Sequence, residues 1–320
     1  MKQENILVIG ANGQLGSVLT QKLQEIYGTE TVVASDISHR ENFNGIFEQL
    51  DATDFDALQA IVIKYGIKHI YHLAAILSAK GEEYPLRTWD INMKTFFNVL
   101  EVSRLNQVKK VFYPSSIAVF GNDIERENTP QASPLMPTTV YGMSKVAGEN
   151  WCHYYFERYG LDVRSIRYPG IIGYQSLPGG GTTDYAVDIY HKAVNNQSFE
   201  CFLTESTKLP MIYMDDAIRA TIELMEAPAN NITVRTSYNL AGMSFTPKEI
   251  YDSIKEVCPE FNIVYRPDFR QKIANSWPKS INDTQAQNDF NWKPLFDLKA
   301  MTADMIKNLK QKKEHHVYIS

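Results

Sequence analysis

An apolar run that leads directly into evenly spaced glycines is the feature that most constrains the fold of this chain. The run Asn5–Ile9 is rich in β-branched residues and predicts a buried parallel strand. Gly10, Gly13 and Gly16 follow at three-residue intervals, and apolar residues then recur at helical spacing up to Ile26. The pattern predicts a strand, a tight turn and a helix, the usual start of an α/β domain with a parallel sheet.

The glycine turn predicts a cradle for a dinucleotide. Glycines let the backbone approach a pyrophosphate closely, and the free N–H groups of a helix N-terminus attract its negative charge. The spacing is Gly-x-x-Gly-x-x-Gly rather than the commoner Gly-x-Gly-x-x-Gly. The strand before it and the helix after it nevertheless meet the structural requirement. A glycine-rich loop without a ligand is the alternative interpretation.

An acidic residue ends the second predicted strand, residues 31–35. Asp36 follows Gly16 by twenty residues, where a carboxylate can accept hydrogen bonds from the adenosine ribose. The same carboxylate would repel a 2′-phosphate, so we expect NAD rather than NADP as the cofactor. Arg40 is close enough in the sequence to leave NADP open, and a turn after a strand is the structural alternative for Asp36.

A tyrosine and a lysine one helical turn apart are the clearest candidates for chemistry. Tyr141 and Lys145 share one face of a helix predicted over residues 141–158, which ends at Gly160. An ammonium beside a phenol favours the phenolate, so we expect the pKa of Tyr141 to fall from about 10 towards neutrality. The phenolate can take a proton from an alcohol whose oxygen is held by Ser116. Tyr-x-x-x-Lys alone is weak evidence, because many surface helices contain it.

Strands and helices alternate through the first half of the chain, which predicts a Rossmann-type, doubly wound parallel sheet. Ligands of such sheets bind beyond the carboxyl ends of the strands. The residues at those ends, expected to share one crevice, are Gly10, Asp36, Asp51, Ala74, Ser116 and Tyr168. We expect an NAD-binding core over residues 1–173, to which 211–241 return, and a smaller α/β substrate lobe from 174–210 and 242–320. The polar tail 310–320 is expected to be frayed.

The composition favours an ordinary cytoplasmic enzyme with a small-molecule substrate. The 320 residues are 44% hydrophobic, and the net charge of -5 argues against nucleic acid or an anionic membrane as a partner. The first strand begins within five residues of Met1, so we expect no targeting peptide, and no apolar run could span a bilayer. The cysteines and histidines lack metal-ligand spacing, so we expect reduced thiols and no metal site.

These motifs together resemble the extended short-chain dehydrogenase/reductase superfamily, the NAD-dependent epimerase/dehydratase family. The shared motifs are Gly10-x-x-Gly13-x-x-Gly16, Asp51, His72-Leu-Ala-Ala, Asn92, Ser115-Ser-Ile-Ala-Val-Phe-Gly and Tyr141-x-x-x-Lys145. Phe120 replaces a tyrosine found in many members, which removes a hydroxyl but keeps the ring. The second half is similar to the NAD-dependent L-threonine 3-dehydrogenases in Tyr168-Pro-Gly-Ile-Ile-Gly, Pro178-Gly-Gly-Gly-Thr-Thr-Asp-Tyr, Leu209-Pro-Met-Ile-Tyr-Met and Ser276-Trp-Pro.

The resemblance implies oxidation of the C3 hydroxyl of L-threonine to 2-amino-3-oxobutyrate, with hydride transfer to NAD. Tyr141 would be the base, Lys145 would lower its pKa and hold the nicotinamide ribose, and Ser116 would orient the alcohol. A nucleotide-sugar 4-epimerase or dehydratase shares the first-half motifs and is the alternative. A non-enzymatic NAD-sensing protein on the same fold is a further one. The superfamily also implies a homodimer through a four-helix interface formed by residues 86–105 and 141–158.

The predicted binding residues, some placed by the strand ends and loops that carry them and some implied by the resemblance, fall into a cofactor set and a substrate set. Besides Tyr141 and Lys145, the cofactor set contains Gly10, Asn12, Gly13, Gln14, Leu15, Asp36, Leu50, Asp51, Leu73, Ala74, Ala75, Asn92, Tyr168 and Pro169. For Asn92, an anchor for a relay water and a packing role both remain open. The substrate set contains Ser78, Ser116, Tyr141, Thr182 and Thr183.

The glycine loop 178–185 is either a lid over the substrate or a solvent-facing linker. Its last polar residue, Asp184, is a candidate for the substrate ammonium and equally for the cap of the next helix. Trp277 is a candidate for the pocket wall or for the core. Lys80 and Arg270 are further candidates for the substrate carboxylate.

Overall fold

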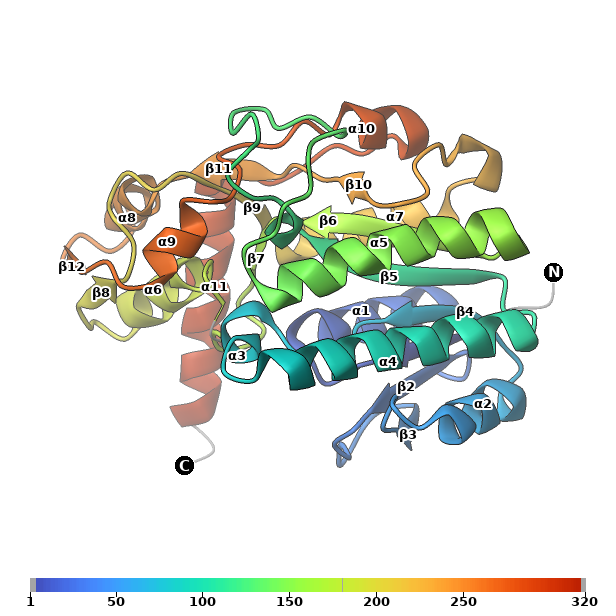
Figure 1. Cartoon of the computed structure of the whole chain (residues 1–320). Coiled ribbons are helices and arrows are strands. Elements are labelled where there is room, and N and C mark those ends of the chain that lie inside the picture. The colour runs from blue at the N-terminus through green and yellow to red at the C-terminus, as the bar shows by residue number, and fades with distance from the viewer. Residues whose placement is uncertain (1–3, 180, 318–320) are drawn as a thin grey trace.

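The computed structural model of the chain describes residues 4–179 and 181–317. Within these residues, seven parallel strands form the main sheet in the order β10-β6-β5-β4-β1-β2-β3. They are β1 (Asn5–Ile9), β2 (Val32–Asp36), β3 (Ile46–Gln49), β4 (Ile67–His72), β5 (Lys110–Ser116), β6 (Asp162–Tyr168) and β10 (Tyr238–Asn239). Helices cover both faces, so the predicted doubly wound α/β fold is confirmed (Figure 1).

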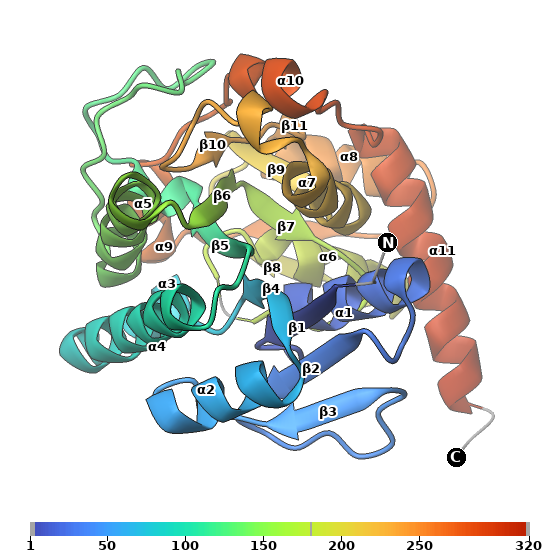
Figure 2. The same cartoon turned by 90° about the vertical axis from the view of Figure 1, so that its right-hand side faces the viewer.

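Two helical layers enclose the main sheet (Figure 2). One layer contains α1 (Gln14–Tyr27) and α7 (Met214–Glu226); the other contains α2 (Phe55–Lys64), α4 (Pro85–Leu105) and α5 (Val140–Tyr159). Ile6 and Val8 of β1 belong to the apolar core under the first layer. Leu7 and Ile9 belong to the core under the second. A strand that is buried on both faces needs an unbroken apolar run, which explains the composition of β1.

The second half of the chain adds a smaller lobe beside the carboxyl ends of the main strands (Figure 1). Among the described residues, its strands form the sheet β11-β9-β7 and the pair β12-β8. They are β7 (Gly170–Ile172), β8 (Phe199–Cys201), β9 (Leu209–Tyr213), β11 (Met243–Phe245) and β12 (Ile263–Tyr265). The helices are α6 (Tyr185–Val194), α8 (Pro247–Lys255), α9 (Arg270–Ala274) and α11 (Leu298–Val317), whereas α10 (Thr284–Phe290) packs against β10 of the main sheet. Short helical turns occur at α3 (Ser78–Gly81), η1 (Ile117–Val119) and η2 (Ala229–Asn231).

The chain returns from the lobe to the main sheet through α7 and β10. β10 pairs with β6 in parallel, and α7 packs against α1. β7 and β9, in contrast, pair with each other in the smaller sheet. β7 and β9 thus lie in the smaller sheet, next to segments that belong to the seven-stranded sheet. The division of the chain into two domains at 173 and 211 therefore stays a prediction.

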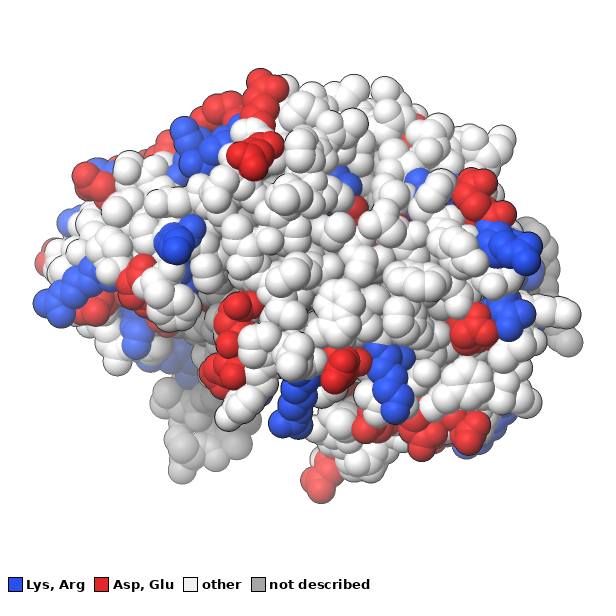
Figure 3. All heavy atoms as spheres, in the orientation of Figure 1, with Lys and Arg blue, Asp and Glu red and all other residues white. Residues whose placement is uncertain are grey.

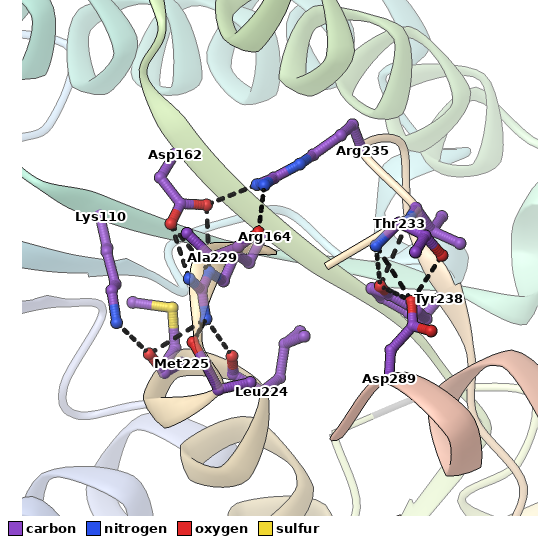
Figure 4. Close-up of polar contacts among 12 residues, drawn as sticks. Lys110, Asp162, Arg164, Leu224, Met225, Ala229, Thr233, Arg235, Tyr238 and Asp289 are labelled. Atoms are coloured by element: carbon purple, nitrogen blue, oxygen red, sulfur yellow. Dashed lines mark hydrogen bonds and ion pairs between the residues drawn. The ribbon is translucent and has the colours of Figure 1, made fainter. Parts of the chain in front are cut away.

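A buried arginine fixes the end of α7 against β6 (Figure 4). The Arg164 guanidinium is fully buried and donates hydrogen bonds of 2.5 and 2.7 Å to the backbone oxygens of Leu224 and Ala227. These are carbonyl groups that a helix end leaves without intrahelical partners. Asp162 pairs with Arg164 at 2.7 Å and with Arg235 at 2.7 Å. The network joins β6, α7 and the segment that leads into β10.

The last helix is longer than the sequence suggests. α11 continues to Val317, so the predicted fraying of residues 310–320 is wrong up to that residue; 318–320 lie outside the described residues. The Lys312 ammonium donates hydrogen bonds of 3.0 and 3.2 Å to the backbone oxygens of Tyr174 and Gln175, a long-range contact that no local pattern reveals. None of the described helices combines the length and the apolar character that crossing a membrane requires.

Candidate active site

A pocket lies where the carboxyl ends of β1, β4, β5 and β6 meet the smaller lobe. Many residues of both predicted sets line it: Gly10, Gly13, Gln14, Leu15, Leu73, Ala75, Ser78, Ser116, Tyr141, Lys145, Tyr168, Pro169, Thr182 and Thr183. The two loop and wall candidates, Asp184 and Trp277, also line it. One crevice therefore brings together residues that are far apart in the sequence.

The remaining predicted cofactor residues are not among the described residues that line this pocket; they are Asn12, Asp36, Leu50, Asp51, Ala74 and Asn92. Asp36 still lies beside the glycine turn, because its carboxylate accepts hydrogen bonds from the backbone N–H of Asn12 at 3.0 Å and of Ser38 at 3.2 Å. Leu50 is buried next to it and donates its N–H to the Asp36 backbone oxygen at 2.8 Å. Asp51 is exposed and accepts from Thr53.

Asn92 of α4 holds the backbone that follows β4. Its Oδ1 accepts from the Ile76 N–H at 2.8 Å, and its Nδ2 donates to the Ile76 oxygen at 3.1 Å. A side-chain amide that pairs with both groups of one residue acts like a strand partner. In this structure Asn92 therefore supports the segment that carries Leu77 and Ser78 into the pocket.

The glycine turn leaves a backbone cradle that side chains would fill. Gly10 has φ +89°, and a Cβ there would lie 2.7 Å from the Ala74 nitrogen. A Cβ on Gly16 would lie 2.0 Å from the Gly10 oxygen. Helix α1 begins after Gly13, which has no side chain that could cap its N–H groups. The positive end of α1 thus points its free donors at the pocket, as the pyrophosphate of a dinucleotide requires.

Ser116, Tyr141 and Lys145 meet on the opposite wall, where β5 ends and α5 begins. Thr139 caps α5 by accepting from the Gly142 N–H at 3.1 Å, which fixes the first turn that carries Tyr141. Ser116 makes a side-chain hydrogen bond with Tyr141. The Lys145 nitrogen lies 5.3 Å from the centroid of the Tyr141 ring.

Burial dominates the acid–base properties of this wall. Desolvation raises the pKa of Tyr141 to about 12, against the smaller lowering effect of the Ser116 hydrogen bond. Desolvation lowers the pKa of Lys145 to about 7, although the nearby Cys152 and Glu149 act in the opposite direction. The expected fall in the Tyr141 pKa is therefore not found in this structure. The spacing of residues along a helix does not reveal how far packing excludes water from the site.

The smaller lobe supplies the outer wall of the pocket. Thr182 is 1% exposed, and its buried hydroxyl has no hydrogen-bond partner among the described residues. Asp184 accepts from the Gly181 N–H at 2.8 Å, which shapes the glycine loop; Gly180, part of the same loop, lies outside the described residues. Trp277 is buried and lines the pocket.

Arg270, a predicted carboxylate candidate, is engaged away from this pocket. Its guanidinium pairs with Asp268 at 2.6 Å, and it is not among the described lining residues. Lys80 is exposed and is likewise not among them.

Several lining residues were not predicted. Ile117 and Ala118 belong to the turn η1, in which Ser116 accepts from the Ala118 N–H at 3.2 Å. Gly170 and Ile171 enter because the chain passes directly from β6 into β7. The Ser115-Ser-Ile-Ala-Val motif could have indicated Ile117 and Ala118. Gly170 and Ile171 have no such local signal, because they depend on pairing with β9. Within the described residues, no group of histidines, cysteines and carboxylates could hold a metal ion.

The fold and the site together define a class of protein. A parallel doubly wound sheet with a glycine cradle beside a Ser-Tyr-Lys wall is typical of NAD-dependent oxidoreductases of the short-chain dehydrogenase/reductase type. The chain belongs to the NAD dependent epimerase/dehydratase family, whose family model matches residues 6–241.

Similar proteins agree with this class. A GalE-like L-threonine dehydrogenase from Cupriavidus necator, in its holo form, is 52% identical, covers 96% of this chain and 100% of its own, and has a TM-score of 0.94. A monomeric L-threonine 3-dehydrogenase from a metagenome, in its apo form, is 48% identical, covers 96% of this chain and 99% of its own, and has a TM-score of 0.93. An uncharacterized epimerase/dehydratase of Staphylococcus aureus (strain USA300) is 45% identical over 97% of this chain and 98% of its own.

Proposed function

We propose that this protein is an NAD-dependent L-threonine 3-dehydrogenase. The observation that carries the proposal is the shared pocket, in which Tyr141 and Ser116 face the glycine cradle while Thr182 approaches from the smaller lobe. The relatives described as L-threonine dehydrogenases support the choice of substrate. The overall reaction converts L-threonine and NAD⁺ into 2-amino-3-oxobutyrate, NADH and a proton.

The chain has the parts that an NAD molecule requires. The Gly10, Gly13 and Gly16 backbone and the start of α1 would hold the pyrophosphate, and the Asp36 carboxylate would accept hydrogen bonds from the adenosine ribose. Lys145 would hold the nicotinamide ribose. When bound, NAD supplies the oxidised ring that accepts the hydride from C3 of threonine.

Tyr141 would take the proton from the C3 hydroxyl onto its phenolate oxygen. This requires the phenol to ionise in a buried site, where desolvation opposes ionisation. The groups of this chain that favour the phenolate are the Ser116 hydroxyl, through a hydrogen bond, and the Lys145 ammonium, through its charge. Ser116 would also orient the substrate oxygen, so that proton removal and departure of the C3 hydride occur from one aligned geometry.

The polar ends of an amino acid need partners at the outer wall. The Thr182 hydroxyl, which has no hydrogen-bond partner among the described residues, and the buried Ser78 hydroxyl are donors that suit a carboxylate. The Asp184 carboxylate, which already accepts from Gly181, has acceptor capacity left for an ammonium. Trp277 would close the wall and limit the size of the bound substrate.

The test is turnover with free cofactor. Purified protein should produce NADH from L-threonine and NAD, more slowly from L-serine, and far more slowly with NADP than with NAD. A nucleotide-sugar epimerase would instead interconvert UDP-glucose and UDP-galactose without net NADH formation. Sugar turnover without threonine oxidation would contradict the proposal.

We further propose that two copies associate through α4 and α5. Figure 3 shows few charged side chains over the middle of the view, where α5 lies, and a mixture of both signs along α4. Leu86 and Trp89 of α4 and Met143 and Tyr154 of α5 are exposed apolar or aromatic residues. Sedimentation velocity should give a dimer, and Trp89→Glu should shift it to a monomer. The metagenomic relative is described as monomeric. If the wild-type protein were also a monomer, this assembly would be contradicted.

A further inference from the structure

A buried carboxylate behind the pocket connects elements that carry pocket residues. Glu149 lies on α5, one helical turn after Lys145 and two turns after Tyr141, so the three side chains share one helical face. Glu149 is 1% exposed and is not among the described residues that line the pocket. Glu149 takes no proton in the reaction proposed for Tyr141, so its burial needs another explanation.

Glu149 binds one residue on each of two adjacent strands. Its Oε1 accepts from the Ser115 hydroxyl at 2.6 Å and from Arg167 Nε at 2.9 Å, and its Oε2 accepts from Arg167 Nη2 at 2.7 Å. Ser115 on β5 and Arg167 on β6 are register partners. Ser115 lines the pocket itself and precedes Ser116, and Arg167 directly precedes Tyr168, which also lines it.

Arg167 extends the network towards the smaller lobe. Its Nη1 donates to the Gln131 backbone oxygen and to Asn239 Oδ1, each at 3.1 Å. Asn239 in turn donates to the backbone oxygens of Thr129 at 3.1 Å and Asn282 at 3.2 Å. One carboxylate is thus the centre of a network that reaches α5, β5, β6, β10 and the loops above them.

A buried ion pair of this kind is poorly explained by stability alone. Desolvation of both charges offsets most of their attraction, and apolar residues of similar volume are often at least as stable. We propose that Glu149 is a positioning residue, which holds Ser116, Tyr168 and Lys145 in register through its hydrogen bonds and its charge. The inference rests on the proposed function for its turnover assay.

The charge of Glu149 also acts on Lys145. Burial lowers the pKa of Lys145 to about 7, and Cys152 and Glu149 partly oppose that effect. The other titratable groups around the ammonium are Tyr141 on the same helix, Tyr113 on β5 and His72 on β4. Without the Glu149 charge, Lys145 should lose its proton at lower pH, so activity that needs the ammonium should decline earlier on the alkaline side.

The first test compares Glu149→Gln with Asp216→Asn. Asp216 is also 1% exposed; it pairs with Arg219 and accepts from the N–H groups of Leu295 and Phe296, away from the pocket. Glu149→Gln should lower kcat for threonine about tenfold or more and move the alkaline limb of the kcat profile down by about one pH unit, with KM changed little. Asp216→Asn should lose thermal stability but keep the wild-type profile. Identical profiles for the two variants would overturn the inference.

The second test measures NAD binding by quenching of tryptophan fluorescence and needs no substrate. Glu149→Gln should weaken NAD binding more at about pH 7 than at about pH 5, where Lys145 is protonated with or without the Glu149 charge, relative to Asp216→Asn. If wild type fails to oxidise threonine while this difference appears, the proposed function fails and the positioning role stands.

If Glu149→Gln does not fold, Ser115→Ala keeps both charges and should lower kcat without moving the alkaline limb. A wild-type kcat in Ser115→Ala would then overturn the inference.

Discussion

Lys145 donates a 2.6 Å hydrogen bond to the backbone oxygen of Pro114, one residue before the pair Ser115 and Ser116. The bond places the ammonium between β5 and α5, beside the ring of Tyr141. A buried ammonium in this position lowers the free energy of unfolding. Its effect can therefore be measured as a change in protein stability, without any substrate.

Lys145→Met should stabilise the free protein at neutral pH. The folded protein releases the Lys145 proton near pH 7, whereas the ordinary pKa is 10.5, so the unfolded chain binds more protons between these values. Stability therefore rises with pH across this window, and the cost of Lys145 is largest at and below pH 7. Removing it should raise the free energy of unfolding at pH 7 by about 1–3 kcal/mol, after allowance for the unpaired Pro114 oxygen.

Melting experiments at neutral and alkaline pH check this prediction. The gain should shrink as the pH approaches 10.5, while threonine-dependent turnover should be lost at every pH. Lys22→Met removes an exposed lysine that pairs with Glu25 and should show no such trend. A Lys145→Met protein that melts lower than wild type at pH 7 would argue against a costly buried ammonium.

Thr182→Val should separate substrate binding from folding. The valine keeps the shape of threonine but lacks the hydroxyl that has no partner among the described residues. We expect the KM for threonine to rise about tenfold or more, because a buried hydrogen bond to a charged group contributes about 1.5–3 kcal/mol. NAD affinity should be unchanged, and the melting temperature should stay level or increase.

Thr302→Val is the matched control for that experiment. Thr302 is also buried, but its hydroxyl bonds to Tyr190 at 2.7 Å and to Ser253 at 2.8 Å, outside the pocket. Its loss should lower stability and leave KM unchanged. Equal KM values in Thr182→Val and wild type would remove Thr182 from the substrate site.

Asp36→Asn should reduce the preference for NAD over NADP. The N–H groups of Asn12 and Ser38 donate to different oxygens of the carboxylate, so the single amide oxygen of asparagine can accept from only one of them. The negative charge that repels a 2′-phosphate is removed as well. We expect the ratio of kcat/KM for NAD to that for NADP to fall about tenfold or more, with the melting temperature somewhat below that of wild type because one hydrogen bond of the turn is lost. An unchanged ratio would mean that another group sets the preference.

Local patterns predicted the parts of the fold that local interactions determine. The β1 strand, its glycine turn and α1 follow directly from apolar spacing and glycine positions. β7 has three residues and exists through its pairing with β9, whose register partners are 41 residues further along the chain, so no local window indicates it. α11 continues past its predicted end at Leu309, and Lys312 in this extension contacts the Tyr174 carbonyl, which no local pattern indicates.

The same distinction applies to the pocket. Ser116, Tyr141 and Lys145 were predicted because helix spacing and strand ends bring such residues together. The raised pKa of Tyr141 was missed, because desolvation depends on everything packed around the phenol. Glu149 was missed although it continues the spacing of Tyr141 and Lys145, since its partners Ser115 and Arg167 come from other elements.

Tyr141→Phe tests the central claim most directly. The variant removes one buried oxygen and should leave NAD affinity within about twofold of wild type, because the cradle around Gly10 is untouched. With L-threonine and saturating NAD, the account predicts that the rate of NADH formation falls by about 10²–10⁴-fold. A variant that binds NAD normally and still forms NADH from threonine at near the wild-type rate would show that another group is the base, and would contradict the account.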